Sequence, residues 1–403
     1  MNLKKNFLLL FISLTTVAMS EDSAVSFKFY GFVRNDIFYN SRQNVESTDG
    51  AFHLFPKPVE LLDGKDKNAV SQAEMLSVAT RLGMDITGSP ILGAKSSAKI
   101  EADFSGFSQN FYVMRLRQAY TKLNWSNTEL LIGQTWHPLF GSVMPSLTNL
   151  NVGAPFQPFN RSPQVRLKQN LWKTISLTAA ASYQMQNLSQ GPIGSSPTYL
   201  KNSLLPDLFI GAEGKTSHWT SGIGFDVKTI KPSVEKLTSS SAIIYTQYVN
   251  KSFQIKAKSL WGGNLSDYLM LSGYGITDSI NGNPTYTNFN ISSSWLNVVY
   301  GSTFQAGIFL GLSKNFGTNK LLAANTGNIF TAYGYGYYQD TQQLLDRLIR
   351  IQPYICYNFP NLKVGLEYDL TSAQYGTLKS DGLVSSPYNI NNTRVVLSVS
   401  YLF

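Results

Sequence analysis

The stretch NTRVVLSVSYLF (Asn392–Phe403) ends the chain, and its residue order decides the fold class. Its odd-numbered positions carry the apolar side chains Val395, Leu397, Val399, Tyr401 and Phe403. Its even-numbered positions include Arg394, Ser398 and Ser400. Side chains of a β-strand point alternately to opposite faces, so this period of two predicts a strand with one apolar and one polar face.

The same alternation recurs along the chain in segments of about ten residues, separated by turn residues. No stretch is apolar enough for a spanning helix, so a membrane protein with this sequence must be a closed barrel. An even number of strands is typical of single-chain bacterial barrels. The sixteen predicted strands are 25–39, 74–87, 94–107, 110–124, 128–136, 163–171, 174–186, 207–215, 218–230, 241–250, 252–262, 292–300, 303–314, 345–358, 362–373 and 392–403.

The connections between these segments alternate between short and long. Short links of a few residues are expected at 89–93, 125–127, 216–217, 250–251 and 359–361. The long links are 40–73, 136–162, 187–206, 263–291, 315–344 and 374–391, and the exceptions are 107–110 and 231–240. Short turns on the periplasmic side and long loops outside are typical of transmembrane barrels. The sequence therefore predicts an all-β transmembrane antiparallel barrel with a defined orientation.

The N-terminus predicts export. Lys4 and Lys5 precede an apolar run of about a dozen residues at 7–18, and small residues stand at Ala18 and Ser20. We expect residues 1–20 to be a signal peptide and 21–403 to form a single barrel domain. Cys356 is the only cysteine, so an internal disulfide is excluded.

The polar face of each strand must point inward if the apolar face meets lipid. A sixteen-stranded barrel leaves an aqueous channel, and rings of arginine and lysine favour anions in a pore. The same arginines could instead pair with neighbouring acidic residues and fill the wall, and both interpretations stay open. On 110–124 we place Arg115 and Arg117 inward and Tyr120 outward. The predicted pore-lining residues are Arg34, Arg81, Lys99, Glu101, Asp103, Arg115, Arg117, Arg166 and Lys168.

The long link 137–162 (HPLFGSVMPSLTNLNVGAPFQPFNRS) differs from the others. It is too apolar for an exposed loop and too rich in proline and glycine for a strand or helix. We predict that it folds into the barrel and narrows the pore as a constriction loop. Covering the barrel top or making a subunit contact are the alternatives. Its candidate constriction residues are Asn149, Asn151, Gln157 and Asn160.

Three stretches resemble trimeric bacterial porins of the DcaP-like type: RLRQAYTKLNW (115–125), LLIGQTWHPLFG (130–141) and RSPQVRL (161–167). The resemblance covers roughly 74–172 and the C-terminus, where a final aromatic strand is similar to the assembly signal of outer-membrane barrels. It implies a sixteen-stranded homotrimer for passive uptake of small solutes, often anionic. Gln118, on a face expected to point outward, is consistent with a subunit contact.

Other functions fit the sequence less well. A barrel enzyme needs an activated nucleophile or carboxylate, and the three histidines stand far apart without an obvious partner. The chain is too short for an energy-coupled transporter with a plug. An adhesin or structural barrel would use the long loops but would leave the charged inner face unexplained.

We therefore expect a porin in the outer membrane of a Gram-negative bacterium, without enzymatic activity, metal or cofactor. Its predicted partners are other copies of itself, outer-membrane lipid and lipopolysaccharide, and small hydrophilic solutes. Nucleic acid is excluded, because the basic residues are spread singly along the strands rather than gathered in one patch.

Overall fold

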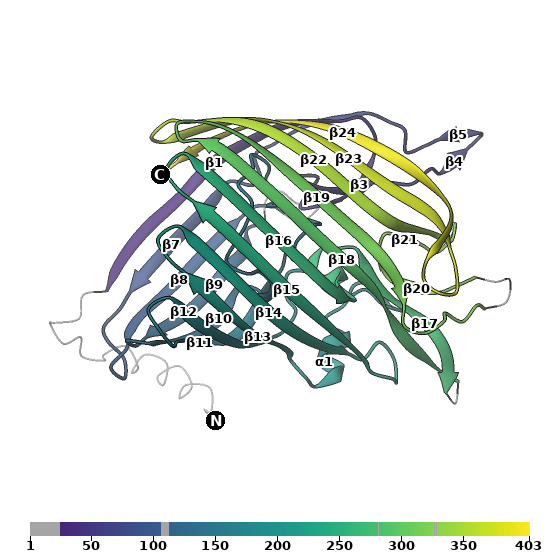
Figure 1. Cartoon of the computed structure of the whole chain (residues 1–403), viewed down its shortest axis with the longest axis horizontal. Helices are drawn as coiled ribbons and strands as arrows, with labels where there is room; N and C mark the ends of the chain where they lie inside the picture. The colour runs from purple at the N-terminus through teal and green to yellow at the C-terminus, as the bar shows by residue number, and fades with distance from the viewer. Residues whose placement is uncertain (1–24, 106–112, 281, 326, 328) are drawn as a thin grey trace, which may run out of the picture.

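The computed structural model describes residues 25–105, 113–280, 282–325, 327 and 329–403. The signal peptide predicted for residues 1–20 lies outside these ranges. None of the described helices is long and apolar enough to span a membrane. One antiparallel sheet closes on itself where β1 (Ser26–Asn40) pairs with β24 (Val384–Leu402), from Phe32 opposite Leu402 to Asn40 opposite Arg394 (Figure 1).

The predicted barrel of sixteen strands is confirmed, and each predicted segment corresponds to one position in its wall. The second position is interrupted and consists of β6 and β7, both paired with β1. The strands that follow β1 are β6 (Gln72–Leu76) with β7 (Arg81–Thr87), β8 (Lys95–Asp103), β9 (Arg115–Asn124), β10 (Thr128–Trp136), β11 (Arg161–Asn170), β12 (Ile175–Ser182), β13 (Asp207–Lys215), β14 (Trp219–Ile230), β15 (Leu237–Val249), β16 (Phe253–Gly263), β18 (Asn283–Gly301), β19 (Phe304–Thr318), β22 (Gln343–Asn358), β23 (Leu362–Leu378) and β24.

The long connections carry short elements of their own. The first contains two small hairpins, and the β4–β5 hairpin projects beyond the barrel wall in Figure 1. These elements are β2 (Asn44–Ser47), β3 (Phe52–Pro56), β4 (Leu61–Leu62), β5 (Lys65–Asp66), η1 (Pro138–Phe140), α1 (Thr198–Ser203), η2 (Ser266–Tyr268), β17 (Ser272–Ile280), β20 (Ala332–Tyr335) and β21 (Tyr337–Tyr338).

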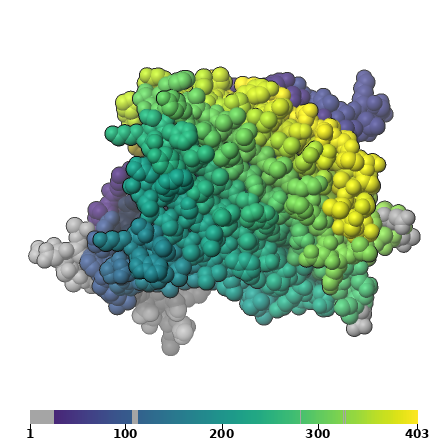
Figure 2. All heavy atoms as spheres, viewed as in Figure 1, coloured from purple at the N-terminus to yellow at the C-terminus, as the bar shows by residue number. Residues whose placement is uncertain are grey.

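The two faces of the wall differ as the alternation predicts. On β1, Phe29 is 71% exposed, whereas Asp36 on the opposite face is 5% exposed. Figure 2 shows the outer side as a continuous band of side chains from the teal strands to the yellow ones. Aromatic residues are exposed near both ends of the strands, as in the interfacial girdles of membrane barrels. They include Phe27, Trp172, Trp219, Tyr300, Phe304 and Tyr401 at the short-turn end, and Tyr39, Trp261 and Phe316 at the other.

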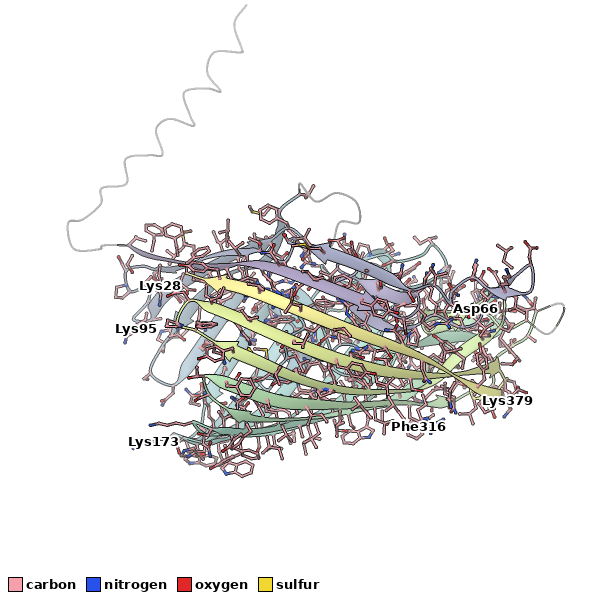
Figure 3. The ribbon with its side chains drawn as sticks, turned by 90° about the horizontal axis from the view of Figure 1, so that it is seen from above. Lys28, Asp66, Lys95, Lys173, Phe316 and Lys379 are labelled. Atoms are coloured by element: carbon pink, nitrogen blue, oxygen red, sulfur yellow. The ribbon has the colours of Figure 1, made fainter. Side chains whose placement is uncertain are left out.

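The two ends of the barrel are different. Figure 3 shows Lys28, Lys95 and Lys173 at the end with the tight turns, and Asp66 and Lys379 at the opposite end. Tight turns join β13 to β14, β15 to β16, β18 to β19 and β22 to β23. The long connections gather at the other end, which is the asymmetry the sequence predicts. The predicted short link at 107–110 lies outside the described residues.

Several strands extend farther toward the loop end than predicted. β18 begins at Asn283 rather than 292, β23 continues to Leu378, and β24 begins at Val384 rather than 392. The outer face of these extensions is polar, with exposed hydrogen bonds such as Asn290 Nδ2 to Asn319 Oδ1 at 2.9 Å. The alternation of outward apolar and inward polar residues therefore ends before the strands do. For this reason the sequence pattern does not predict the loop-side ends of these strands.

A β-bulge on β9 corrects two predictions. Glu101 pairs with Gln118 and Ala102 with Leu116, so Arg117 is an additional residue in the ladder. The bulge shifts the alternation by one position. Gln118 therefore points inward, donating to Glu101 at 3.3 Å, and does not lie on a subunit-facing surface. Tyr120, predicted to point outward, stands opposite Lys99 on the inner wall.

Candidate functional site

The loop 137–160 crosses the barrel interior and is bonded to the wall on one side by β1 and β23. Arg34 on β1 donates from Nη2 to the carbonyl oxygen of Thr148 at 2.7 Å. Glu367 Oε2 on β23 accepts hydrogen bonds from the backbone N–H groups of Thr148 and Asn149, both at 3.1 Å. These contacts hold the middle of the loop against strands of the wall that are distant in sequence from β10 and β11, which the loop connects.

On another side, the loop is held by β16 and β18. Asn297 Oδ1 accepts from the backbone N–H of Ser146 at 2.8 Å, and Lys256 Nζ donates to the hydroxyl of Ser146 at 2.8 Å. Lys258 donates to the side-chain oxygen of Gln157 at 3.0 Å and to the carbonyl of Phe140. The loop is therefore hydrogen-bonded to β1, β16, β18 and β23 of the wall.

The four amide residues predicted in this loop are all buried. Asn149 and Asn151 accept from backbone N–H groups two residues ahead, both at 3.2 Å, which is the geometry of Asx turns. Gln157 receives Lys258, and Asn160 donates to the carbonyl oxygen of Asp267 at 2.8 Å. Their hydrogen bonds set the shape of the loop.

The first long loop also enters the barrel, whereas the sequence predicts an inserted loop only at 137–162. Arg350 Nη2 donates to the carbonyl oxygens of Leu54 at 2.8 Å and His53 at 3.2 Å, and its Nη1 donates to Ala154 of the crossing loop at 2.8 Å. Phe52 packs edge to face on Phe159, with ring centroids 4.9 Å apart. The apolar run AFHLFP (51–56) in a long loop was the available signal.

His53 is fully buried in this inserted loop, and its Nε2 lies 3.1 Å from the carboxylate of Asp369. Burial, together with the positive charge of Arg350, lowers the pKa of His53 to about 3. The imidazole is therefore neutral at physiological pH.

Four of the predicted pore-lining residues form one ion-pair cluster on β8 and β9. Arg117 contacts both carboxylates, at 2.8 Å to Glu101 Oε1 and 2.6 Å to Asp103 Oδ2. Arg115 makes a two-point contact with Asp103, with both N–O distances 3.0 Å. Arg81 on β7 is more loosely placed, 3.9 Å from Glu101.

The remaining predicted pore-lining residues do not form ion pairs with this cluster, although Lys99 is linked to it through Tyr30, whose hydroxyl accepts from Lys99 at 3.1 Å and donates to Glu101 at 3.0 Å. Arg34 pairs with Asp36 at 2.8 Å, and Lys99 pairs with Asp85 at 2.8 Å. Arg166 and Lys168 on β11 line a separate cavity of about 260 Å³, into which His137 and Tyr245 also project. Within that cavity Lys168 lies 3.6 Å from Glu213.

Several inward cations, Arg166 and Arg394 among them, have no carboxylate within ion-pair distance among the described residues. Arg161 on β11, Lys256 and Lys258 bond only to neutral groups, such as Gln186 Oε1 at 2.9 Å from Arg161 Nη1. Arg161 is not among the predicted pore-lining residues, although no aspartate or glutamate occurs between Glu129 and Asp207. This stretch without acidic residues is the sequence feature that indicates a surplus of positive charge.

In the described part of the chain, one group of buried side chains has ligand atoms close enough for a metal: His137, Asp207 and Asp226, all within 4.8 Å of one another. His137 Nδ1 accepts from the backbone N–H of Leu139 at 3.2 Å. A neutral ring then carries its proton on Nε2, which faces Asp207 at 3.4 Å. That tautomer leaves no ring lone pair for a metal, so the group fits a close His137–Asp207 contact at the base of the loop better than a metal site.

The comparisons with known proteins support the fold. No protein-family model and no curated protein sequence matches the chain. Among solved structures, the outer-membrane channel DcaP of Acinetobacter baumannii is similar with a TM-score of 0.70, at 21% identity, over 94% of this chain and 98% of that one. An anion-selective porin from Comamonas acidovorans matches with a TM-score of 0.57, at 10% identity, over 94% of this chain and 100% of that one.

A third similar structure is OmpT, an outer-membrane protein of Vibrio cholerae, in a loop-deletion form. Its TM-score is 0.55, at 9% identity, over 94% of this chain and 100% of that one. These likenesses confirm the predicted porin-type fold, including its resemblance to DcaP. The predicted outer-membrane location agrees with this fold, because only closed barrels carry β-structure across lipid.

Proposed function

We propose that the chain is a passive channel of the outer membrane that admits small hydrophilic solutes and favours anions. The observation that carries this proposal is the set of inward cations Arg161, Lys256 and Lys258, which lack carboxylate partners within the described part of the barrel. Uncompensated cations along a pore attract anions and repel cations.

The lumenal arginines have two roles in this proposal. Arg115 and Arg117 are largely balanced by Glu101 and Asp103, and this pairing supports the wall-filling interpretation for those residues. The net positive field comes from the cations without carboxylate partners, including Arg161, Lys256 and Lys258. The loop 137–160, together with the inserted run 51–56, limits the size of the solutes that pass.

The chain's oligomeric state and surroundings are also part of the proposal. A trimer form is known for OmpT of Vibrio cholerae, whose fold is similar, and we propose a homotrimer here. The exposed apolar wall would contact membrane lipid, and the loop end would contact lipopolysaccharide. Passive diffusion through such a channel requires no catalytic group.

Liposome swelling tests the channel directly. Vesicles that contain the purified protein should swell in isotonic solutions of small neutral sugars, and the rate should fall steeply as solute size increases. At matched size, organic anions should enter faster than organic cations. Vesicles that do not swell in any solute would refute the channel and favour an adhesive or structural barrel.

A further inference from the structure

One cavity inside the barrel is lined by both basic and apolar side chains. It has a volume of about 170 Å³ and lies between the strands β7–β11, the crossing loop and the first long loop. Its basic and acidic lining residues are Arg81, Arg115, Arg117, Arg161, Glu101 and Asp103. Its apolar lining residues are Phe52, Trp136, Met144, Leu150, Val152 and Phe159.

The charge of this cavity is not balanced. Four guanidinium groups face two carboxylates, which leaves a surplus of two positive charges. The two carboxylates are already engaged, because Arg115 and Arg117 hold Asp103, and Arg117 also holds Glu101. Arg81 and Arg161 therefore supply the surplus.

Arg161 is the most unusual of the four. It is 1% exposed, and its Nη1 bonds to Gln186, but its Nε and Nη2 have no hydrogen-bond partner among the residues that the structure describes. Its guanidinium lies 4.1 Å from the ring centre of Trp136 and 5.2 Å from that of Phe159. A buried guanidinium normally satisfies its donors with a carboxylate or phosphate, so two donors without a partner, on a residue that lines this cavity, point to an anionic ligand.

We propose that this cavity binds a small monoanion that carries an apolar or aromatic body. The anionic group would accept from Arg161 and Arg81, and the body would lie against Phe159, Met144 and the neighbouring apolar side chains. Three of the four guanidinium groups come from β7 and β9, whereas most of the apolar lining residues come from the two inserted loops, so a ligand charged at one end fits better than one charged at both ends. This inference rests on the proposed channel function, since the ligand must reach the cavity through the barrel.

Block of single-channel current tests the inference, with benzoate as the probe. Acetate has the same anionic group without the ring, succinate has two such groups, and benzyl alcohol has the ring without charge. We expect benzoate to bind about tenfold more tightly than acetate or succinate, a factor equal to ~1.4 kcal/mol, and benzyl alcohol not to bind.

Two variants locate the site. Arg161→Gln should weaken benzoate block about tenfold and should fold, because it removes a buried charge without a partner. Arg81→Gln, at the more exposed edge, should weaken it less. Lys95→Gln is the matched control, since it removes a cation of β8 at the short-turn end, outside this cavity, and it should leave benzoate block unchanged.

The outcomes separate this inference from the channel proposal. A channel that conducts and prefers chloride but binds benzoate no better than acetate would overturn the inference alone. Tighter block by succinate, or equal loss in Arg161→Gln and Lys95→Gln, would also overturn it. A protein that does not conduct would overturn the channel proposal, and equilibrium dialysis of benzoate against the detergent-solubilised protein would then decide whether the cavity binds it.

Discussion

The guanidinium of Arg34 donates a 2.7 Å hydrogen bond to the carbonyl oxygen of Thr148, a contact between residues 114 positions apart. Arg34 is on the first strand of the barrel, and Thr148 is in the loop that crosses the interior. The carboxylate of Asp36, 2.8 Å from the same Nη2, orients the guanidinium. The position of the crossing loop therefore depends on the lumenal side chains Arg34 and Asp36. Substitution of these two residues should change conduction more than it changes folding.

Glu367→Ala should loosen the crossing loop. The carboxylate accepts from the backbone N–H groups of Thr148 and Asn149, and each buried donor left without a partner costs about 1–3 kcal/mol. We expect higher open-channel noise and a larger mean conductance in single-channel recordings. Glu129→Ala is the control, because this carboxylate pairs with Lys122 at 3.1 Å on the wall. Equal noise in both variants would show that Glu367 does not hold the loop.

Arg350→Met should destabilise the barrel itself. Arg350 joins both inserted loops and pairs with Asp369 at 3.2 Å, and both partners of this ion pair are fully buried. Removing one partner of a buried ion pair costs about 3–5 kcal/mol. Urea unfolding in detergent micelles measures the loss. Arg347→Met, on the same strand, is the comparison, and a similar small effect in both variants would contradict the role assigned to Arg350.

The inserted run 51–56 should become less stable in acid because of His53. Burial holds the pKa of His53 at about 3, below its ordinary value of 6.5, so the folded loop disfavours the proton. The stability that depends on the neutral ring is complete above pH 6.5 and is lost progressively as the pH falls toward 3. Amide exchange in residues 50–56, corrected for intrinsic rates, should accelerate over this window. In His53→Gln the acceleration should be smaller, and an unchanged pH profile would exclude His53 as its source.

The outward face at mid-strand should not tolerate charge. Ile132 is at the centre of β10, exposed on the outer wall, and stands opposite Val165 of β11. A lysine on the lipid face near the bilayer midplane costs about 2–4 kcal/mol. Ile132→Lys should therefore lower the folded fraction in lipid vesicles, whereas Ile132→Leu should not. Normal folding of Ile132→Lys in lipid would mean that this face does not meet the hydrocarbon core.

The wall of the barrel could be predicted because its signal is local. Alternation of apolar and polar residues in strands such as β24 follows from lipid on one side and water on the other, and each segment shows it independently. The predictions failed where that contrast ends. Asn290 and Gln374 are in strand extensions whose outer face is polar, and the bulge at Arg117 reverses the alternation for Tyr120.

The interior of the barrel was less predictable, because it depends on contacts between distant residues. The apolar composition of 137–162 indicated a packed loop, but its partners on β16, β18 and β23 could not be derived from spacing. The run 51–56 has a similarly apolar composition, but its insertion into the barrel is not among the predictions. Arg161 could not be predicted for a different reason. What distinguishes it is the lack of a carboxylate partner, and the sequence feature that indicates this is the absence of aspartate and glutamate from 130 to 206.

The zero-current potential across a planar bilayer, with a salt gradient over the purified protein, tests the central claim most directly. An anion-favouring channel predicts stepwise conductance and a potential whose sign reports chloride as the more permeant ion. Removing Arg115 and Arg117 together should leave the carboxylates they balance unpaired and shift the potential toward cation preference. A cation-selective potential in the unmodified protein would contradict the proposed preference, and the absence of conductance would contradict the channel itself.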